Sequence, residues 1–120
     1  MRASLAEALV DAPAPADLLY HLTESAPERI EGQLLEALAA GLDVLSASEA
    51  MFHPALRHAD FAARLDAAAR ANGVTVSGTG INPGFSFDSV PLALARATSG
   101  VSRVTITRAI DVTGTGPGDI

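Results

Sequence analysis

The sequence contains no cysteine, and basic residues are scarce. Without cysteine the chain has no disulfide, no thiolate metal site and no thiol nucleophile. Lys and Arg total 8 against 14 Asp and Glu, which gives a formal net charge of −6. An acidic surface repels phosphate backbones, so we expect no nucleic-acid partner. The three histidines lack the spacing of a metal site, and we expect no bound metal.

Long apolar runs are also missing. No stretch reaches the roughly 18 apolar residues of a membrane-spanning helix, so we expect no membrane partner. Glu7 and Asp11 interrupt the N-terminal stretch, where a secretory signal peptide needs continuous apolar residues. These absences favour a small acidic protein of the reducing cytoplasm.

What the chain does contain is an alternation of short apolar runs and helical periodicity. Hydrophobic residues make up 48% of the sequence, enough for one core. Apolar runs predict buried strands of a parallel sheet over residues 17–22, 42–46 and 74–77. Helices are predicted over residues 4–10, 27–40, 54–71 and 88–99. This order implies right-handed crossovers and a parallel sheet with helices on both faces.

The pattern changes near Gly100. From Val104 to Val112 apolar and polar residues alternate, which is typical of a half-exposed strand in an antiparallel or mixed sheet. We therefore predict an α/β fold, a partial Rossmann-like parallel sheet with flanking helices over residues 1–100. Residues 101–120 would supply one C-terminal strand and loop of a following α+β domain.

In parallel sheets, ligands bind beyond the carboxyl ends of the strands, so the loops after the predicted strands are the candidate site. The third loop is the most distinctive, with glycines at 78, 80 and 84 before a predicted helix. Three interpretations stay open: a phosphate-binding loop, a structural turn, or a later Rossmann loop that approaches nicotinamide or substrate. The glycine spacing differs from G-x-G-x-x-G and Pro83 lacks an amide proton, which favours the last.

The two earlier loops carry small and polar residues. In the second, Ser46, Ala47 and Ser48 could let a flat ring lie against the backbone, or a serine could cap the next helix, with Glu49 in its first turn. In the first, His21 could transfer protons near neutrality, although a packed and hydrogen-bonded histidine is the more common case.

Arg108 falls among the apolar positions of the last predicted strand. A buried unpaired charge is costly, so we expect Arg108 to pair with a carboxylate of the chain or to anchor a substrate carboxylate.

Two segments at a characteristic distance carry a family resemblance: AGLDVLSASE at 40–49 and GTGINPGF at 78–85. With them, the stretch from Asp17 to about Asp111 resembles the dihydrodipicolinate reductase-like oxidoreductases, and among these the 2,4-diaminopentanoate dehydrogenase branch. The resemblance implies hydride transfer between NAD(P) and a small amino or imino acid or a diamine. The cofactor-lining residues it implies are Leu22, Thr23, Ser46, Ala47, Ser48, Gly80, Ile81, Asn82, Pro83 and Gly84.

The resemblance also implies that this chain is partial. The family begins with a βαβ unit that holds its phosphate-binding glycine loop, and Met1 stands only one predicted helix before the strand that matches the family's fourth. We expect part of an oxidoreductase whose catalytic residues lie elsewhere. The alternative is a non-enzymatic module that associates through the open edge at residues 17–22, with itself or with a separately encoded first half. A third possibility is another anionic ligand at Gly78 to Gly84.

Overall fold

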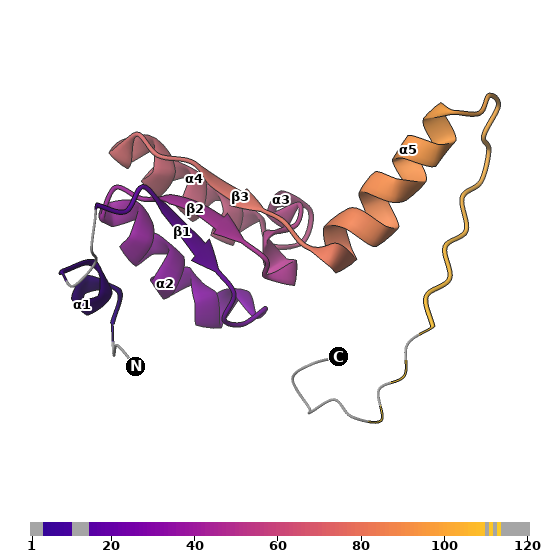
Figure 1. Ribbon diagram of the computed structural model, residues 1–120. Coiled ribbons are helices and arrows are strands. Elements are labelled where there is room, and N and C mark those ends of the chain that lie inside the picture. Colours follow the sequence, from indigo (N-terminus) through magenta and orange to yellow (C-terminus); the bar gives the residue numbers. More distant parts are fainter. Residues whose placement is uncertain (1–3, 11–14, 110, 112, 114–120) are drawn as a thin grey trace.

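A three-stranded parallel sheet organises the molecule (Figure 1). The computed structural model describes residues 4–10, 15–109, 111 and 113. The strands β1 (Leu18–His21), β2 (Asp43–Ser46) and β3 (Val76–Gly78) lie in the order β1-β2-β3, and both pairings are parallel. The predicted parallel α/β sheet is therefore confirmed.

Two helices make the crossovers between the strands. The helix α2 (Pro27–Ala39) connects β1 to β2, and α4 (Ala59–Asn72) connects β2 to β3. The shorter elements are α1 (Leu5–Val10), η1 (Glu49–Met51), α3 (Pro54–Arg57), η2 (Ile81–Ser89) and α5 (Val90–Arg96). No helix in the described part of the chain is long and apolar enough to cross a membrane.

Helices α2 and α4 lie on the same face of the sheet, behind it in Figure 1. The expectation of helices on both faces is wrong for the described residues, and the strand order gives the reason. Both crossovers step in the same direction along the sheet, and right-handed connections that step the same way place their helices on one side. The other face therefore leaves Leu18 and Tyr20 exposed.

The core forms between α2, α4 and the covered face of the sheet. On α2 the buried residues recur at i, i+4, i+7 and i+8, the spacing of one helical stripe. Helix α4 contributes Phe61, Leu65 and Ala69, and β2 contributes Val44. Above this core Arg64 pairs with Glu31 of α2, and the guanidinium holds the pKa of the Glu31 carboxyl below its ordinary value.

Helix α4 begins later than predicted because the chain is interrupted at His58. The predicted helix from Pro54 included Leu56 in its apolar face, but Leu56 is 83% exposed. The stripe that reaches the core starts only at Phe61, so the preceding turn, α3, is not held against α2. The predicted stop is confirmed: Gly73 adopts φ of +67°, a left-handed conformation that glycine takes without strain.

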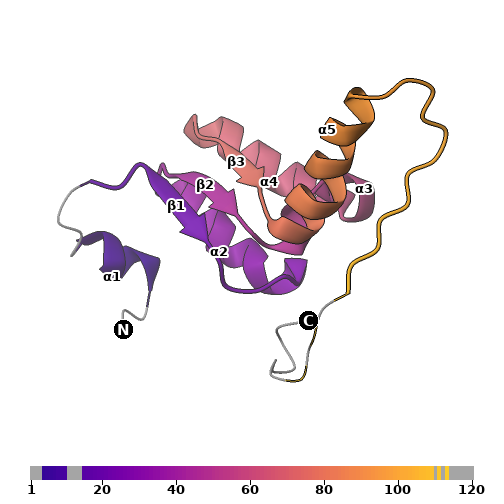
Figure 2. The same ribbon diagram turned by 45° about the vertical axis from the view of Figure 1, so that its right-hand side comes forward.

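Beyond β3 the chain leaves the sheet. Segment η2 and α5 project away from it, followed by an extended segment (Figures 1 and 2). Residues 101–109 form no strand and are exposed, so the predicted C-terminal strand is wrong for these positions; Ile110 and Val112 lie outside the described residues. Its alternating pattern is present, but among the described residues no strand lies beside it to supply the hydrogen bonds that a strand requires.

Removing the centre of the α2 stripe tests this packing. Leu34 is fully buried, so Leu34→Ala should lower the free energy of unfolding by about 2–5 kcal/mol. The matched control, Leu56→Ala, should change it by less than about 0.5 kcal/mol because that side chain is exposed. Urea unfolding monitored by circular dichroism measures both, and equal losses would contradict the proposed core.

Candidate functional site

The loops that follow the three strands are joined along one edge of the sheet. The amide of Ala47 donates to the carbonyl of His21 at 3.0 Å, and the amide of Thr79 donates to the carbonyl of Ser46 at 2.8 Å. We call residues 22–23, 46–49 and 79–84 the rim (Figure 2). The structure thus brings together the predicted cofactor residues of all three loops, while their role in binding stays a prediction.

A buried hydrogen-bond network fixes the first two loops. His21 is 4% exposed; its ring Nδ1 lies 2.9 Å from the Ser46 hydroxyl, and its Nε2 lies 3.2 Å from Gln33 Oε1. Thr23 Oγ1 lies 2.8 Å from the same Nε2 and donates to Gln33 Oε1 at 2.9 Å. Of the alternatives that sequence left open for His21, the packed and hydrogen-bonded state is the one observed.

One assignment of protons satisfies the network. Thr23 Oγ1 donates to Gln33 Oε1, so His21 Nε2, which lies 2.8 Å from Thr23 Oγ1 and 3.2 Å from Gln33 Oε1, donates its proton to these oxygens. With a neutral ring, Nδ1 then accepts from the Ser46 hydroxyl, whose oxygen also accepts from the Ser48 amide at 3.2 Å. In this assignment each ring nitrogen has a complementary partner, and no buried side-chain polar atom of the described residues lacks one.

The serines of the second loop face inward. Ser46 is fully buried, and the Ser48 hydroxyl donates to the carbonyl of Ser25 at 3.2 Å. Ser48 occupies the N-cap position of η1 and Glu49 lies in its first turn, as the capping interpretation expected, but the Ser48 side chain makes no capping hydrogen bond. A ligand on this loop would therefore meet backbone atoms, Ala47 and the exposed Glu49, rather than the serine hydroxyls.

The third loop packs closely against the second. A Cβ on Gly78 would lie 2.1 Å from the carbonyl oxygen of Met51, so only glycine fits there. Farther along, the Gly84 amide donates to Asp88 at 2.9 Å and the Phe85 amide donates to the Gly80 carbonyl at 2.9 Å. Both amides are engaged and Pro83 has none, which argues against the phosphate-binding interpretation of this loop.

A pocket of about 320 Å³ opens where the second and third loops meet, and we call it the rim pocket. The Phe52 ring forms one wall: a Cβ on Gly84 would lie 3.5 Å from it, and the His53 ring meets it edge-on at 4.7 Å between centroids. The pocket is lined by charges of both signs and by apolar side chains: Glu49, Phe52, His53, Leu56, Arg57, Pro83 and Asp88.

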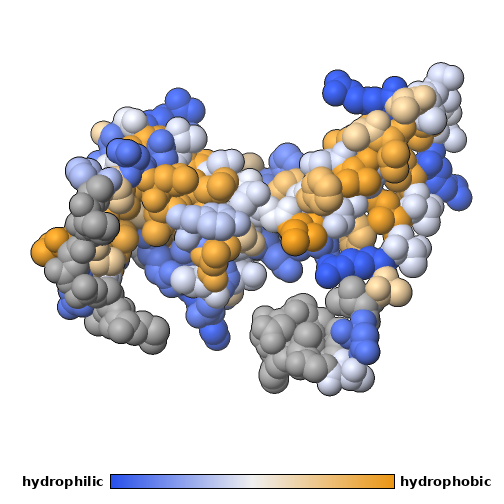
Figure 3. Space-filling model, viewed as in Figure 1, coloured by the Kyte–Doolittle hydropathy of each residue, from blue (hydrophilic) through white to orange (hydrophobic). Residues whose placement is uncertain are grey.

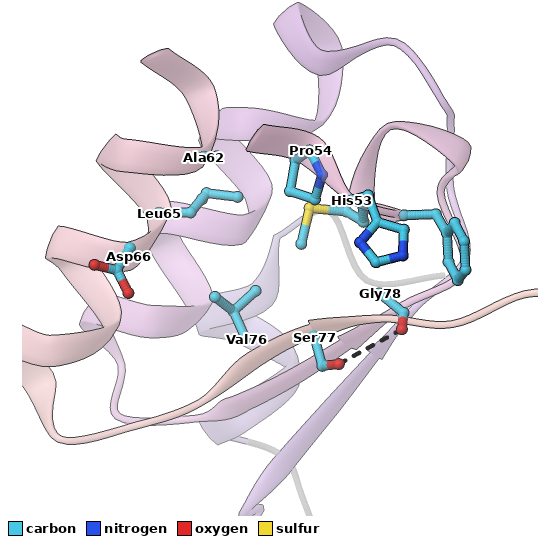
Figure 4. Close-up of a pocket in the computed structure, with 10 residues that line it drawn as sticks. His53, Pro54, Ala62, Leu65, Asp66, Val76, Ser77 and Gly78 are labelled. Carbon is cyan, nitrogen blue, oxygen red and sulfur yellow. Dashed lines mark hydrogen bonds between the residues drawn. The ribbon is translucent and has the colours of Figure 1, made fainter. Parts of the chain in front are cut away.

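A second pocket of about 360 Å³, the side pocket, lies between β3 and α4 (Figure 4). Leu65 and Val76 point into it from opposite walls, with His53 at one end and Asp66 at the other. The Asp66 carboxylate accepts from Arg70 at 2.8 Å, which holds its pKa below the ordinary value. None of the predicted cofactor-lining residues lines this pocket, although Gly78, the first residue of the third loop, does.

Two residues that contribute to the site, Gln33 and Phe52, were not predicted from the sequence. Gln33 sits on the exposed side of α2, and Phe52 lies in a loop whose sequence shows no periodic pattern.

Arg108 is exposed and, within the described part of the chain, has no carboxylate partner, so the expected intramolecular pair is not formed. Its role as a substrate anchor stays a prediction.

The fold and rim define a class: an α/β protein whose parallel strands present their trailing loops along one edge. No family model matches the chain. It is similar to the 2,4-diaminopentanoate dehydrogenase of Acetoanaerobium sticklandii, with 28% identity over 102 residues. The match covers 85% of this chain but only 29% of that enzyme. This similarity supports a distant relationship to oxidoreductases.

The buried network predicts a specific loss of stability. Ser46→Ala removes the partner of both His21 Nδ1 and the Ser48 amide, so unfolding should become easier by about 1–3 kcal/mol. Ser77→Ala is the control, because Ser77 is exposed and its hydroxyl reaches only the neighbouring Gly78 carbonyl, at 3.5 Å. Chemical denaturation compares the two, and an unchanged midpoint for Ser46→Ala would contradict the network.

Proposed function

We propose that this chain supplies the nicotinamide-facing part of an NAD(P)-dependent oxidoreductase. The reaction would transfer a hydride between the nicotinamide and a small amino or imino acid or a diamine. The observation that carries the proposal is the rim, where loops that follow three parallel strands are hydrogen-bonded into one edge. Such edges are where open α/β sheets bind ligands.

The centre of the rim suits a flat ring. Ala47 and Gly80 have little or no side chain, and a Cβ on Gly80 would lie 4.0 Å from the Ala47 carbonyl, so the two loops are neighbours. Leu22 and Thr23 close one end, and Ile81 lies 71% exposed at the other. The bound nicotinamide would supply the hydride donor or acceptor, and the chain would orient its ring.

The residues present fit the ring better than the phosphates. The amides of Gly84 and Phe85 are already donated within the chain, so the third loop offers few free donors to a pyrophosphate. We therefore assign binding of the ring and its carboxamide to this rim and leave the phosphates to residues outside it.

The rim pocket suits a substrate that carries amino groups. Glu49 and Asp88 line it together with one guanidinium, that of Arg57. Carboxylates attract the ammonium groups of an amino acid or diamine, and a guanidinium attracts a substrate carboxylate. The name of the similar enzyme, 2,4-diaminopentanoate dehydrogenase, specifies a molecule with both kinds of group. Arg108 does not line this pocket, and its role as an anchor for a substrate carboxylate is proposed from the sequence alone.

Binding of reduced nicotinamide mononucleotide tests the ring site. In ¹⁵N-labelled protein we expect shift changes at Leu22, Thr23, Ala47 and Gly80, and none at the side pocket. Ala47→Leu should weaken binding at least about tenfold, because the added side chain occupies the ring position. Ala93→Leu, an exposed change on α5, should leave it unaltered. Changes confined to the side pocket, or equal affinity in both variants, would refute the assignment.

Titration with 2,4-diaminopentanoate tests the rim pocket. Glu49→Gln should weaken binding by up to about fivefold, since it removes one exposed charge facing an ammonium group. Asp66→Asn changes a carboxylate of the side pocket and should have no effect. Calorimetry measures both variants, and a loss with Asp66→Asn alone would move the substrate to the side pocket.

A further inference from the structure

His53 holds an unfavourable backbone conformation just before α3. Its φ and ψ are both 52°, and in the described part of the chain it is the one residue other than glycine with a positive φ. In this left-handed region the Cβ atom crowds the following carbonyl oxygen. Pro54 comes next and restricts the preceding residue further. The surroundings of His53 must therefore maintain this conformation.

The chain is anchored on both sides of His53. Before it, Ala50 and Met51 are buried, and the Met51 carbonyl packs so closely against Gly78 that no Cβ would fit there. After it, the Leu56 amide donates to the His53 carbonyl at 3.0 Å. Strained residues that are held in this way are concentrated at functional sites. The conformation of His53 therefore points to a role for its side chain.

The ring of His53 is exposed where several pockets meet. It lines the rim pocket, the side pocket and a smaller pocket of about 160 Å³ beside the first residues of α2 (Figure 4). The ring packs edge-on against Phe52 and makes no hydrogen bond or ion pair within the described part of the chain. His21, by contrast, is committed to the buried network, and His58 does not line the rim pocket. His53 is thus the histidine available to a ligand in the rim pocket.

We propose that His53 accepts the proton that an amine substrate must lose before hydride transfer. This role rests on the proposed function, to which it adds a catalytic residue. An ammonium nitrogen has no lone pair, so it first gives one proton to a ring nitrogen of His53. The freed lone pair then forms the C=N bond while the C–H hydrogen leaves as a hydride to the nicotinamide. The substrate is oxidised to an iminium ion, the nicotinamide is reduced, and His53 carries the proton.

The charges of the rim pocket suit this role. The uncovered face of the sheet and much of α5 present hydrophobic surface on the side shown in Figure 3. In the rim pocket, by contrast, Glu49 of η1 and Asp88 of η2 attract ammonium groups, and Arg57 of α3 attracts a carboxylate. An imidazole is about a hundredfold stronger base than a carboxylate. Of the groups that line this pocket, His53 therefore takes the ammonium proton most readily.

Two further ionisable groups lie near His53, outside the rim pocket. Asp66 of α4 lines the side pocket and accepts from Arg70 at 2.8 Å. His58 lines the smaller pocket together with Arg57. Because His58 shares the neighbourhood of His53 without reaching the rim pocket, it provides the matched control.

Binding at two pH values tests the assignment. Calorimetric titration with 2,4-diaminopentanoate is performed at pH 5.5 and 7.5, a range in which histidine changes charge while carboxylates and amines keep theirs. A protonated ring repels an ammonium group, so the unaltered chain should bind at least about fivefold more weakly at pH 5.5. His53→Asn should bind equally at both, because asparagine tolerates the left-handed conformation but does not titrate. His58→Asn should retain the pH dependence.

His53→Gly separates the ring from the backbone. Glycine adopts the left-handed conformation without strain, so this variant should unfold at a urea concentration no lower than that of the unaltered chain. Its affinity should also be independent of pH. Failure of His53→Gly to fold would show that the ring serves the fold, and it would contradict the proposal.

The outcomes separate this role from the proposed function. If 2,4-diaminopentanoate binds at neither pH, the proposed function fails and the role of His53 fails with it. If the ligand binds equally at both pH values, or if His53→Asn keeps the pH dependence, the role of His53 alone is overturned.

Discussion

The hydrogen bond between the Ser46 hydroxyl and His21 Nδ1, 2.9 Å long and buried, joins the carboxyl ends of β1 and β2 where the candidate site begins. Loss of either partner would leave a buried polar atom unpaired, which costs more than the bond itself contributes. The bond also holds the second loop in place, since Ser46 accepts from Ser48 through its hydroxyl and from Thr79 through its carbonyl. The positions of Ala47 and the third loop therefore depend on it.

Local sequence patterns predicted the helices, the strands and the sheet edge that carries the candidate site. Apolar runs identified all three strands, because a buried strand is a continuous run of apolar residues. The apolar stripe from Ile30 to Leu38 identified α2, because a helix buried on one side repeats apolar residues at helical spacing. Since parallel strands end on the same side, the loops at Leu22, Ser46 and Gly80 could be predicted to share one rim. Their hydrogen bonds across the rim agree with that prediction.

The remaining features depend on neighbours that a single sequence does not specify. Strand order decides which face of the sheet the helices cover. The helix breaks at His58 because α4 meets α2 only beyond that residue. Residues 101–109 are extended without forming a strand because no described strand pairs with them. In the site, Gln33 lies on an exposed helical position and joins His21 only through folding. The inward turn of the two serines likewise required the three-dimensional arrangement.

The central claim is that three strand-end loops form one surface that holds a nicotinamide ring. Intermolecular nuclear Overhauser effects from the ring protons of bound reduced nicotinamide mononucleotide measure this directly. The account predicts contacts with the Ala47 methyl group of the second loop and with Ile81 of the third, observed in the same complex. Contacts with Ala62 and Leu65 of the side pocket in their place, or no contact with either loop, would contradict it.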